Sequence, residues 1–381
     1  MGVVYSSARC RFISRSSSIN NILQQNDERN QTDKTELDVD LNYLIGKLER
    51  LPAYAKKLFE LSKLYLTSAE ENSNDCKSQS FHMTESAMIG RSEQCQASNE
   101  LSSLYLFTPL KQKHPLHCGQ TFIQWKATFD VQQLAYMCAP SRNTIYLQPL
   151  DSFPEVISQF VLSISQLYLS LFQLLQGFCQ IFFLGVEVVL LAPVSSTNWN
   201  IRSRLSNSTG RPQLCVNDFF PLLQLRVPNN GIGIVGILWT DLYPEGFNFV
   251  LGEASVYHKS AVVSFGVDTS EDMTQVNGVL VWRLFKTLTH EICHLLGLTH
   301  CEFFSCAMNE SISISQAMSQ PLVLCPVCLR KVQHVCGFDV LERYTKLHHF
   351  LLNVTQQLDG DLSQFNQTIQ WLHNCILYVT H

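Results

Sequence analysis

A short string of histidines in the C-terminal third of the chain has the spacing of a catalytic metal site. The string consists of His290, Glu291, His294, Gly297 and His300, in the pattern H-E-x-x-H-x-x-G-x-x-H. On a helix, His290 and His294 share one face, so both imidazoles can bind one zinc ion. Gly297 can end that helix in a left-handed conformation and bring His300 back as a third ligand. Three protein ligands leave the fourth zinc position open, which is typical of a catalytic site.

Glu291 has a different role in this pattern. It projects beside the metal rather than onto it, which suits a general base for a zinc-bound water. The alternative is an amphipathic helix that carries polar residues and no metal. The complete string arises by chance in on the order of one chain in tens of thousands, so we favour the metal site.

Four cysteines follow the histidines at the spacing of a second metal site. Cys301 and Cys306 form C-x4-C, and Cys325 and Cys328 form C-x2-C, which predicts a closed, tetrahedral structural zinc. The neighbours His300 and Cys301 point in different directions, so we expect them to serve two different ions. The alternative is a set of ordinary buried or disulfide-bonded cysteines. The remaining cysteines show no such pairing and are expected to be free thiols.

The compact string that runs from His290 through Met308 to Cys328 resembles the archaemetzincins. These are a branch of the metzincin zinc peptidases with a second, four-cysteine zinc site. Further segments with the same resemblance are 145–149, 240–244 and 329–334. The resemblance covers roughly residues 140 to 350. The chain resembles the vertebrate members more than the short prokaryotic ones, because it has a long N-terminal extension.

The resemblance implies a role for each matched position and two zinc ions as cofactors. It implies that Glu291 is the general base and that Met308 lies in a turn beneath the histidines. It implies that the ligands of the catalytic zinc are His290, His294 and His300. It implies that the ligands of the structural zinc are Cys301, Cys306, Cys325 and Cys328. It further implies aminopeptidase-like cleavage of a peptide or protein substrate, with an edge strand between Phe247 and Phe265 that pairs with the extended substrate.

The expected fold class is α/β (α+β): a metzincin-like zinc protease domain with a twisted mixed sheet, an active-site helix and a C-terminal helix. Strands are expected at 143–147, 181–191, 231–240, 247–250 and 261–265. Helices are expected at 154–179, 282–296 and 338–352.

The stretch 156–186 is apolar enough for a membrane span to be considered. Glutamines recur in it every seven residues, however, which favours a helix with one wet face. A Gly231-x-Gly233-x-x-Gly236 match to a dinucleotide fingerprint is rejected, because no helix is expected after it.

We expect four parts along the chain: a disordered tail (1–40), a helical extension (41–140) with a polar linker (68–100), the peptidase domain (141–352) and a C-terminal tail (353–381). Pro52 should divide the first helical stretch into two helices. The extension is expected to pack on the peptidase domain and to have no chemistry of its own.

The first residues fit an N-myristoylation pattern at Gly2, with nearby arginines as a second membrane signal. A mitochondrial transit peptide and an unmodified flexible tail are the alternatives, and the unmodified tail is our default expectation.

Composition restricts the function classes. A formal net charge of −5, spread thinly, argues against a nucleic-acid binder. Fourteen cysteines without a recognisable secretory signal favour reduced thiols in a cytoplasmic or nuclear protein that is not secreted. We expect a monomer whose membrane contact, if any, is through Gly2.

The competing hypothesis is a zinc-stabilised interaction module or scaffold with little or no peptidase activity. Glu291 argues against it, since a purely structural metal site gains nothing from a carboxylate there.

Overall fold

The computed structural model describes residues 41–64, 66, 106–110, 119–134, 142–164, 166–266 and 275–381, with only the backbone described for 131–134. Our expectations for the tail 1–40, for lipidation at Gly2 and for the linker 68–100 lie outside these residues.

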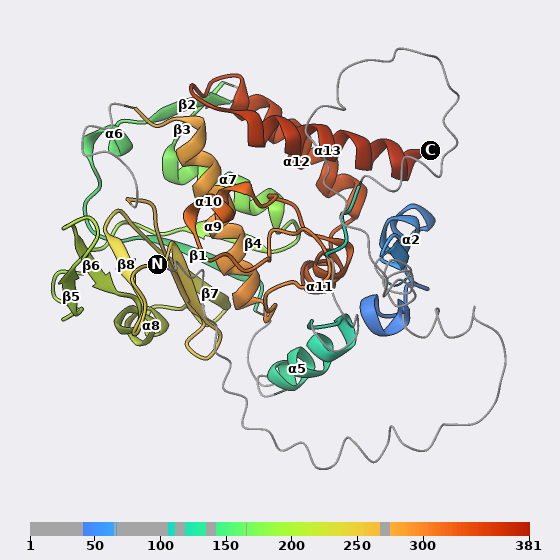
Figure 1. Ribbon diagram of the computed structural model, residues 1–381, viewed down its shortest axis with the longest axis horizontal. Helices are drawn as coiled ribbons and strands as arrows, with labels where there is room; N and C mark the ends of the chain where they lie inside the picture. The colour runs from blue at the N-terminus through green and yellow to red at the C-terminus, as the bar shows by residue number, and fades with distance from the viewer. Residues whose placement is uncertain are drawn as a thin grey trace, which may run out of the picture.

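A five-stranded sheet forms the centre of the molecule (Figure 1). Its first four strands are parallel, and the last is an antiparallel edge strand. In spatial order the strands are β4 (Glu187–Leu190), β1 (Thr144–Pro149), β7 (Gly231–Leu238), β10 (Ser260–Ser264) and β9 (Gly252–Ser255). Strands β1 and β7 are buried almost throughout, as expected for parallel strands that are covered on both faces. The predicted mixed α/β class is confirmed.

Helices cover both faces of this sheet. On one face lie α7 (Leu171–Phe182) and α9 (Gly278–Leu295), and on the other lies α8 (Val216–Gln224). Successive residues of β7 alternate between the two cores: Val235 packs with the α9 side and Ile234 with the α8 side. The long helix α9 therefore rests directly on the sheet beside the edge strand β9.

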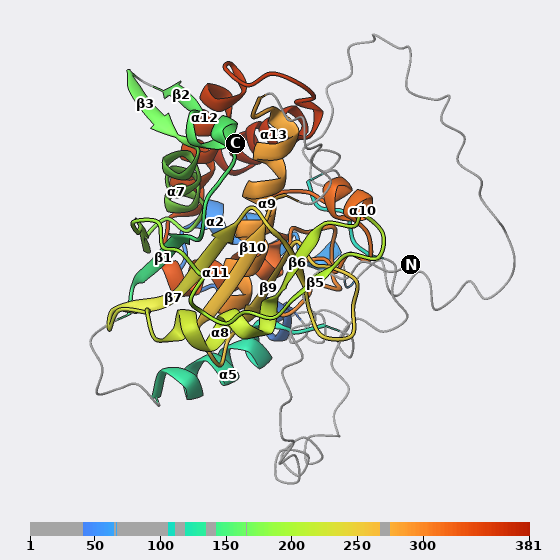
Figure 2. The same cartoon turned by 90° about the vertical axis from the view of Figure 1, so that its left-hand side faces the viewer.

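Three helices complete the C-terminal part: α11 (Pro326–Cys336), α12 (Val340–Thr355) and α13 (Ser363–Thr380). Helices α12 and α13 lie side by side in Figures 1 and 2. The expectation of a tail at 353–381 was wrong, because α13 buries Phe365, Leu372 and Cys375 in the main core. These positions recur at helical spacing, so this segment contributes an apolar face to the domain.

Two helices of the extension pack on this C-terminal part. Helix α2 (Ala53–Glu60) contacts α11 and α13, and α5 (Phe122–Leu134) contacts α11. Residues 41–45 are also helical, so the predicted pair of helices is confirmed. The first helix ends at Ile45 rather than at Pro52, because Gly46 adopts a left-handed φ of 72°. Pro52 lies just before the first turn of α2, where its missing N–H costs no hydrogen bond.

The single helix expected at 154–179 was wrong. The segment contains a short helix, a β-hairpin and the start of α7: α6 (Glu155–Ser158), β2 (Val161–Ile164) and β3 (Leu167–Ser170). Gln166, between the hairpin strands, has a left-handed φ of 68°. A capping box of Ser170 and Gln173 then starts α7. No helix among the described residues combines the length and apolar character that a bilayer crossing requires.

The strand expectations hold in part. The segment 181–191 contains β4 only at its end, because its first residues still belong to α7. The segment 247–250 is not a continuous strand: it follows a turn at Gly246, which has a φ of 85°, and only Val250 makes a β-bridge, to Leu242. Arg204 Nη2 donates to the carbonyls of Phe247 and Asn248 at 2.7 Å each. The glycine-rich stretch lies inside β7 and is followed by another strand, β8 (Asp241–Tyr243), so rejecting a dinucleotide loop was correct.

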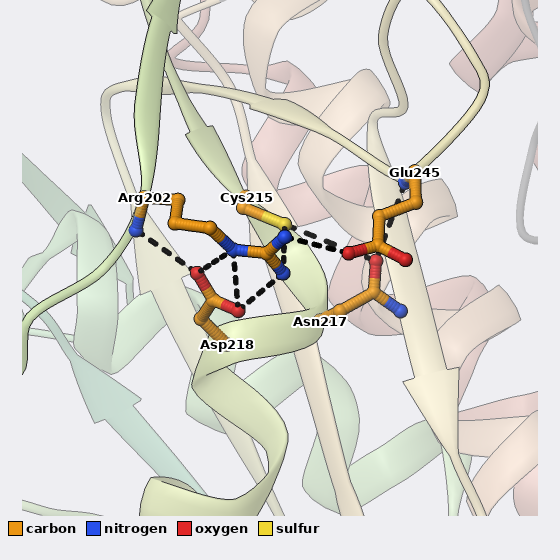
Figure 3. Close-up of polar contacts among 5 residues, drawn as sticks. All are labelled: Arg202, Cys215, Asn217, Asp218 and Glu245. Atoms are coloured by element: carbon orange, nitrogen blue, oxygen red, sulfur yellow. Dashed lines mark hydrogen bonds and ion pairs between the residues drawn. The ribbon is translucent and has the colours of Figure 1, made fainter.

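A polar cluster fixes the segment that leads into the edge strand (Figure 3). It lies beside a smaller sheet of β5 (Ser203–Leu205), β6 (Pro212–Cys215) and β8. The Arg202 guanidinium donates to both carboxylate oxygens of Asp218, with contacts of 2.7 to 3.1 Å, and to Glu245 at 2.7 Å. These hydrogen bonds lower the pKa of Asp218. Because Glu245 lies between β8 and β9, the cluster ties α8 to the approach of β9.

Candidate metal centre

Helix α9 positions the first two histidines. The Asn277 side chain begins the helix by accepting from the backbone N–H of Leu280 at 3.0 Å. His290 and His294 follow one turn apart near its C-terminal end. Gly297 then adopts a φ of 82°, which confirms the predicted left-handed turn. The backbone N–H of Leu298 reaches back to Cys293 O at 3.1 Å, and the chain reverses toward His300.

The three histidines meet with their ring nitrogens within 4.8 Å of one another. His290 Nδ1 lies 2.8 Å from Ala307 O, and His294 Nδ1 lies 2.7 Å from Leu298 O. A carbonyl only accepts, so each Nδ1 carries the proton and each Nε2 presents a lone pair. The two Nε2 atoms face each other at 3.1 Å, and His300 Nε2 is buried without a hydrogen-bond partner. Converging lone pairs repel, so this arrangement fits a shared cation such as zinc.

The surroundings of these imidazoles keep them neutral. Burial lowers the pKa of His294 to about 3 and that of His290 well below its ordinary value. Burial also lowers the pKa of His300. Neutral imidazole is the form that binds a metal ion, so the protonation state agrees with the geometry.

Glu291 lies next to His290 with its carboxylate fully buried. Neither carboxylate oxygen has a hydrogen-bond partner in the described structure. Burial raises the pKa of this group well above its usual range, and the nearby Glu253 raises it further. The Glu291 side chain packs against the backbone of Gly252 on β9: a Cβ added at Gly252 would lie 2.8 Å from Glu291 Cγ. Glu291 therefore lies between the histidine cluster on α9 and the edge strand.

The four predicted cysteines form a second cluster, with all sulfurs within 4.8 Å of one another and no disulfide bond. Cys301 and Cys306 come from the loop after His300, and Cys325 and Cys328 begin α11. The Cys301 and Cys325 sulfurs are 3.6 Å apart. A tetrahedral zinc with bonds of about 2.3 Å separates its sulfur ligands by roughly 3.8 Å, so the donor set fits a closed zinc site.

One short loop links the two clusters. Ala307 accepts from His290, and the backbone N–H of Cys301 donates to Met308 O at 2.8 Å. Met308 is fully buried in the core. Asn309 closes the loop: its Oδ1 accepts from Cys306 N at 2.7 Å, and its Nδ2 donates to Cys301 O at 2.8 Å. No signal in the sequence marks Asn309, because an amide that binds only backbone atoms has no characteristic spacing.

A buried lysine on α9 was also missed. Lys286 is 1% exposed, and its Nζ donates to the carbonyl oxygens of Ala317 and Gln320, the latter at 2.8 Å. Burial lowers its pKa to about 7. Lys286 thus holds the C-terminal end of α10 (Ile314–Ser319), the helix that follows the Met308 loop, against α9.

Comparison with known proteins gives concordant matches. The model of Peptidase family M54 matches residues 226–334, which contain both clusters. Archaemetzincin-2 of Mus musculus is 33% identical over 236 residues, covering 55% of this chain and 64% of that protein. Archaemetzincin-2 of Homo sapiens is 32% identical over 250 residues, covering 58% of this chain and 67% of that protein.

A solved structure also matches. The crystal structure of archaemetzincin from Archaeoglobus fulgidus, complexed with malonate, is 25% identical with a TM-score of 0.35. The match covers 49% of this chain and 99% of that one. Against the mouse protein, this chain spans slightly less than two thirds of the relative's length.

Proposed function

Because this chain belongs to the archaemetzincin family, we propose that it is a zinc-dependent peptidase whose catalytic ion is held by His290, His294 and His300. One observation carries the proposal: three neutral imidazoles converge next to a buried carboxylate that has no hydrogen-bond partner among the described residues. A structural zinc site has no use for such a carboxylate, whereas a hydrolytic site needs a proton acceptor.

The residues around the site divide the chemistry between them. A zinc ion held there would polarise the scissile carbonyl and make water nucleophilic at neutral pH. Glu291 is the group that can accept a proton from the attacking water and deliver it to the leaving amine. The carbonyls of Ala307 and Leu298 hold the two helix histidines in one tautomer and one orientation.

The edge strand β9 is the proposed substrate-binding element. It contacts α9 and pairs with β10 on one side, and among the described strands none pairs along its other side. A peptide in extended conformation can add to such an edge through main-chain hydrogen bonds. The segment expected from the sequence, Phe247 to Phe265, contains this strand.

The four cysteines are the proposed ligands of a second, structural zinc, which gives two zinc ions per chain. All four are almost fully buried, so no position is open for substrate. This ion would join the loop after His300 to the first turn of α11. It would thereby hold the loop that carries the third histidine and Met308.

Replacing Glu291 by Gln tests the catalytic proposal. We expect two zinc ions per chain in both proteins, and a loss of peptide hydrolysis on the order of 10² to 10⁴-fold in the variant. Zinc is measured by atomic emission, and hydrolysis with a broad peptide library. Equal activity in both proteins, or none in the wild type, would favour the competing hypothesis of a zinc-stabilised interaction module.

An aminopeptidase preference is the finer part of the proposal, and the family resemblance suggests it. It predicts that peptides with a free N-terminal amine are cleaved at least tenfold faster than the same peptides with an acetylated N-terminus. Equal rates for the two sets would instead indicate an endopeptidase.

A further inference from the structure

Gln120, in the N-terminal extension just before α5, contacts the turn that leads to the third histidine. Its side-chain Nε2 donates to Gly297 O at 3.1 Å, and its Oε1 accepts from the backbone N–H of Thr299 at 3.2 Å. One amide group thus satisfies an acceptor and a donor of the same turn, as a neighbouring strand would. The backbone N–H groups of Gly297 and Leu298 already bond within the turn, to His294 O and Cys293 O. The Gln120 amide binds two other groups, Gly297 O and Thr299 N, and so holds the part of the turn that leads to His300.

Two further side chains fix this contact. Lys331, from α11, is 1% exposed and donates to Gln120 Oε1 at 3.1 Å. Trp125, on α5, is also 1% exposed and donates from Nε1 to Leu296 O at 3.0 Å. Backbone positions 296, 297 and 299 are therefore all bound by the extension. Lys331 Nζ also donates to the Gln120 backbone carbonyl, so the Gln120 amide oxygen and backbone are both held in place by this buried side chain.

The extension also holds the chain beyond His300. Residues 108–110 pair with residues 303–305: Leu110 N donates to Phe303 O, and Ser305 N donates to Thr108 O, both at 2.9 Å. The segment that contains His300 and Cys301 is thus bound on both flanks by residues from the N-terminal side. His290 and His294 differ, since the hydrogen bonds of α9 already place them.

We propose that Gln120 is a positioning residue for the third metal ligand, His300, so that the N-terminal extension completes the catalytic site. The inference rests on the proposed zinc site at the three histidines, but not on its peptidase activity. His300 Nε2 can complete the set only if the turn 296–299 keeps its shape, and the Gln120 amide binds that turn at two of its backbone groups. Loss of the amide should therefore weaken metal binding at the histidines and leave the cysteine site unchanged.

The test replaces Gln120 by Ala in the full chain, with Gln176→Ala as a matched control. Gln176 also donates from its amide to a backbone carbonyl, Val188 O at 2.9 Å, but it lies on α7 away from both clusters. The zinc affinity of the histidine site is measured by competition with a chelator. Cobalt substitution at the histidine site adds a visible absorption spectrum that reports ligand number and geometry.

We expect Gln120→Ala to lower zinc affinity at the histidine site by about 10 to 100-fold, as found when groups that orient metal ligands are removed. The cobalt spectrum should change, and the cysteine site should keep its metal. Gln120→Glu retains the acceptor for Thr299 and Lys331 and should give an intermediate loss, which covers the case in which the alanine variant does not fold. Gln176→Ala should match the wild type in metal affinity and spectrum.

Unchanged zinc affinity and an unchanged cobalt spectrum in Gln120→Ala, even with a lower melting temperature, would overturn the proposal and leave Gln120 a purely structural role. A protein without peptidase activity that still shows this metal-affinity loss would refute the proposed function alone. The two outcomes are therefore separate.

Discussion

The position of the proposed general base depends on a residue without a side chain, Gly252 on the edge strand β9. A Cβ at this position would lie 2.8 Å from Glu291 Cγ, 2.9 Å from Glu291 Oε1 and 3.0 Å from Thr287 Cγ2. Ordinary contacts between carbon atoms are about 3.5 to 4.0 Å, so the new methyl group would be roughly 0.7 Å or more too close. We therefore predict that Gly252→Ala displaces the Glu291 carboxylate.

The strand cannot easily move instead, because Gly252 is paired with Val263 on β10. The Glu291 side chain is the flexible partner and should shift by roughly 0.5 to 1 Å. A misplacement of about 1 Å can cost on the order of 10²-fold in rate. That is about 2.7 kcal/mol of transition-state stabilisation. Overpacking should also lower the free energy of unfolding by about 1 to 3 kcal/mol.

The assay is kcat/KM for a fluorogenic peptide at saturating zinc, with zinc content and urea unfolding measured on the same samples. Gly177→Ala in α7 is the control, because its Cβ would meet Phe350 at 3.6 Å, an ordinary contact distance. Alanine favours a helix interior over glycine by about 1 kcal/mol, so this control should be as active as the wild type and at least as stable. If Gly252→Ala keeps two zinc ions and a kcat/KM within about twofold of the wild type, β9 does not set the position of Glu291.

Two further predictions concern Glu253 and Cys325. Burial raises the pKa of Glu253 from 4.5 to about 7, so the folded state binds this proton more tightly than the unfolded state. Stability should therefore fall by about 3 kcal/mol as pH rises from 4.5 through 7, and Glu253→Gln should be more stable than the wild type by about that amount at pH 8. Urea unfolding of both proteins from pH 4 to 8.5 measures the difference, and parallel pH profiles would contradict it. Cys325→Ser should lose one zinc ion and much of the stability, since metal-binding energy contributes to folding in such sites. A variant that keeps two zinc ions and its melting temperature would show that the four cysteines are not a zinc site.

The donor residues were predictable because their signals are local in sequence. His290 and His294 are four residues apart on one helix, and the left-handed glycine after them requires only a few residues of context. The cysteine set spans a longer segment, but its two short pairs are recognisable by spacing alone. The structure brings each of these sets within 4.8 Å, as the pattern requires.

The supporting contacts were not predictable, because they join segments that are distant in sequence. Gln120 reaches the turn at Gly297 across 177 positions, and nothing in the local sequence marks a glutamine that will bind a distant backbone. Gly252 constrains the Glu291 side chain only because α9 passes over this residue of β9. The hairpin within 154–179 was missed for a different reason. Its apolar residues are as typical of a helix as of a strand, although Val161, Leu167 and Tyr168 are exposed in the hairpin. The turn at Gln166 also has no glycine to signal it.

The two proposed metal sites and the extension form one connected set of constraints around the loop 298–309. The cysteine cluster brings Cys301 and Cys306 of this loop together with Cys325 and Cys328 at the start of α11, and the bond from Cys301 N to Met308 O closes the loop. Ala307, within the same loop, orients His290 on α9. Gln120 holds the N-terminal side of the loop and accepts a hydrogen bond from Lys331, which lies on α11 as well. Helix α11 therefore supports the third ligand from two directions, through the cysteines and through the extension. Because the loop forms neither a helix nor a multi-residue strand, the position of His300 should depend on both supports, and weakening either should loosen the histidine site.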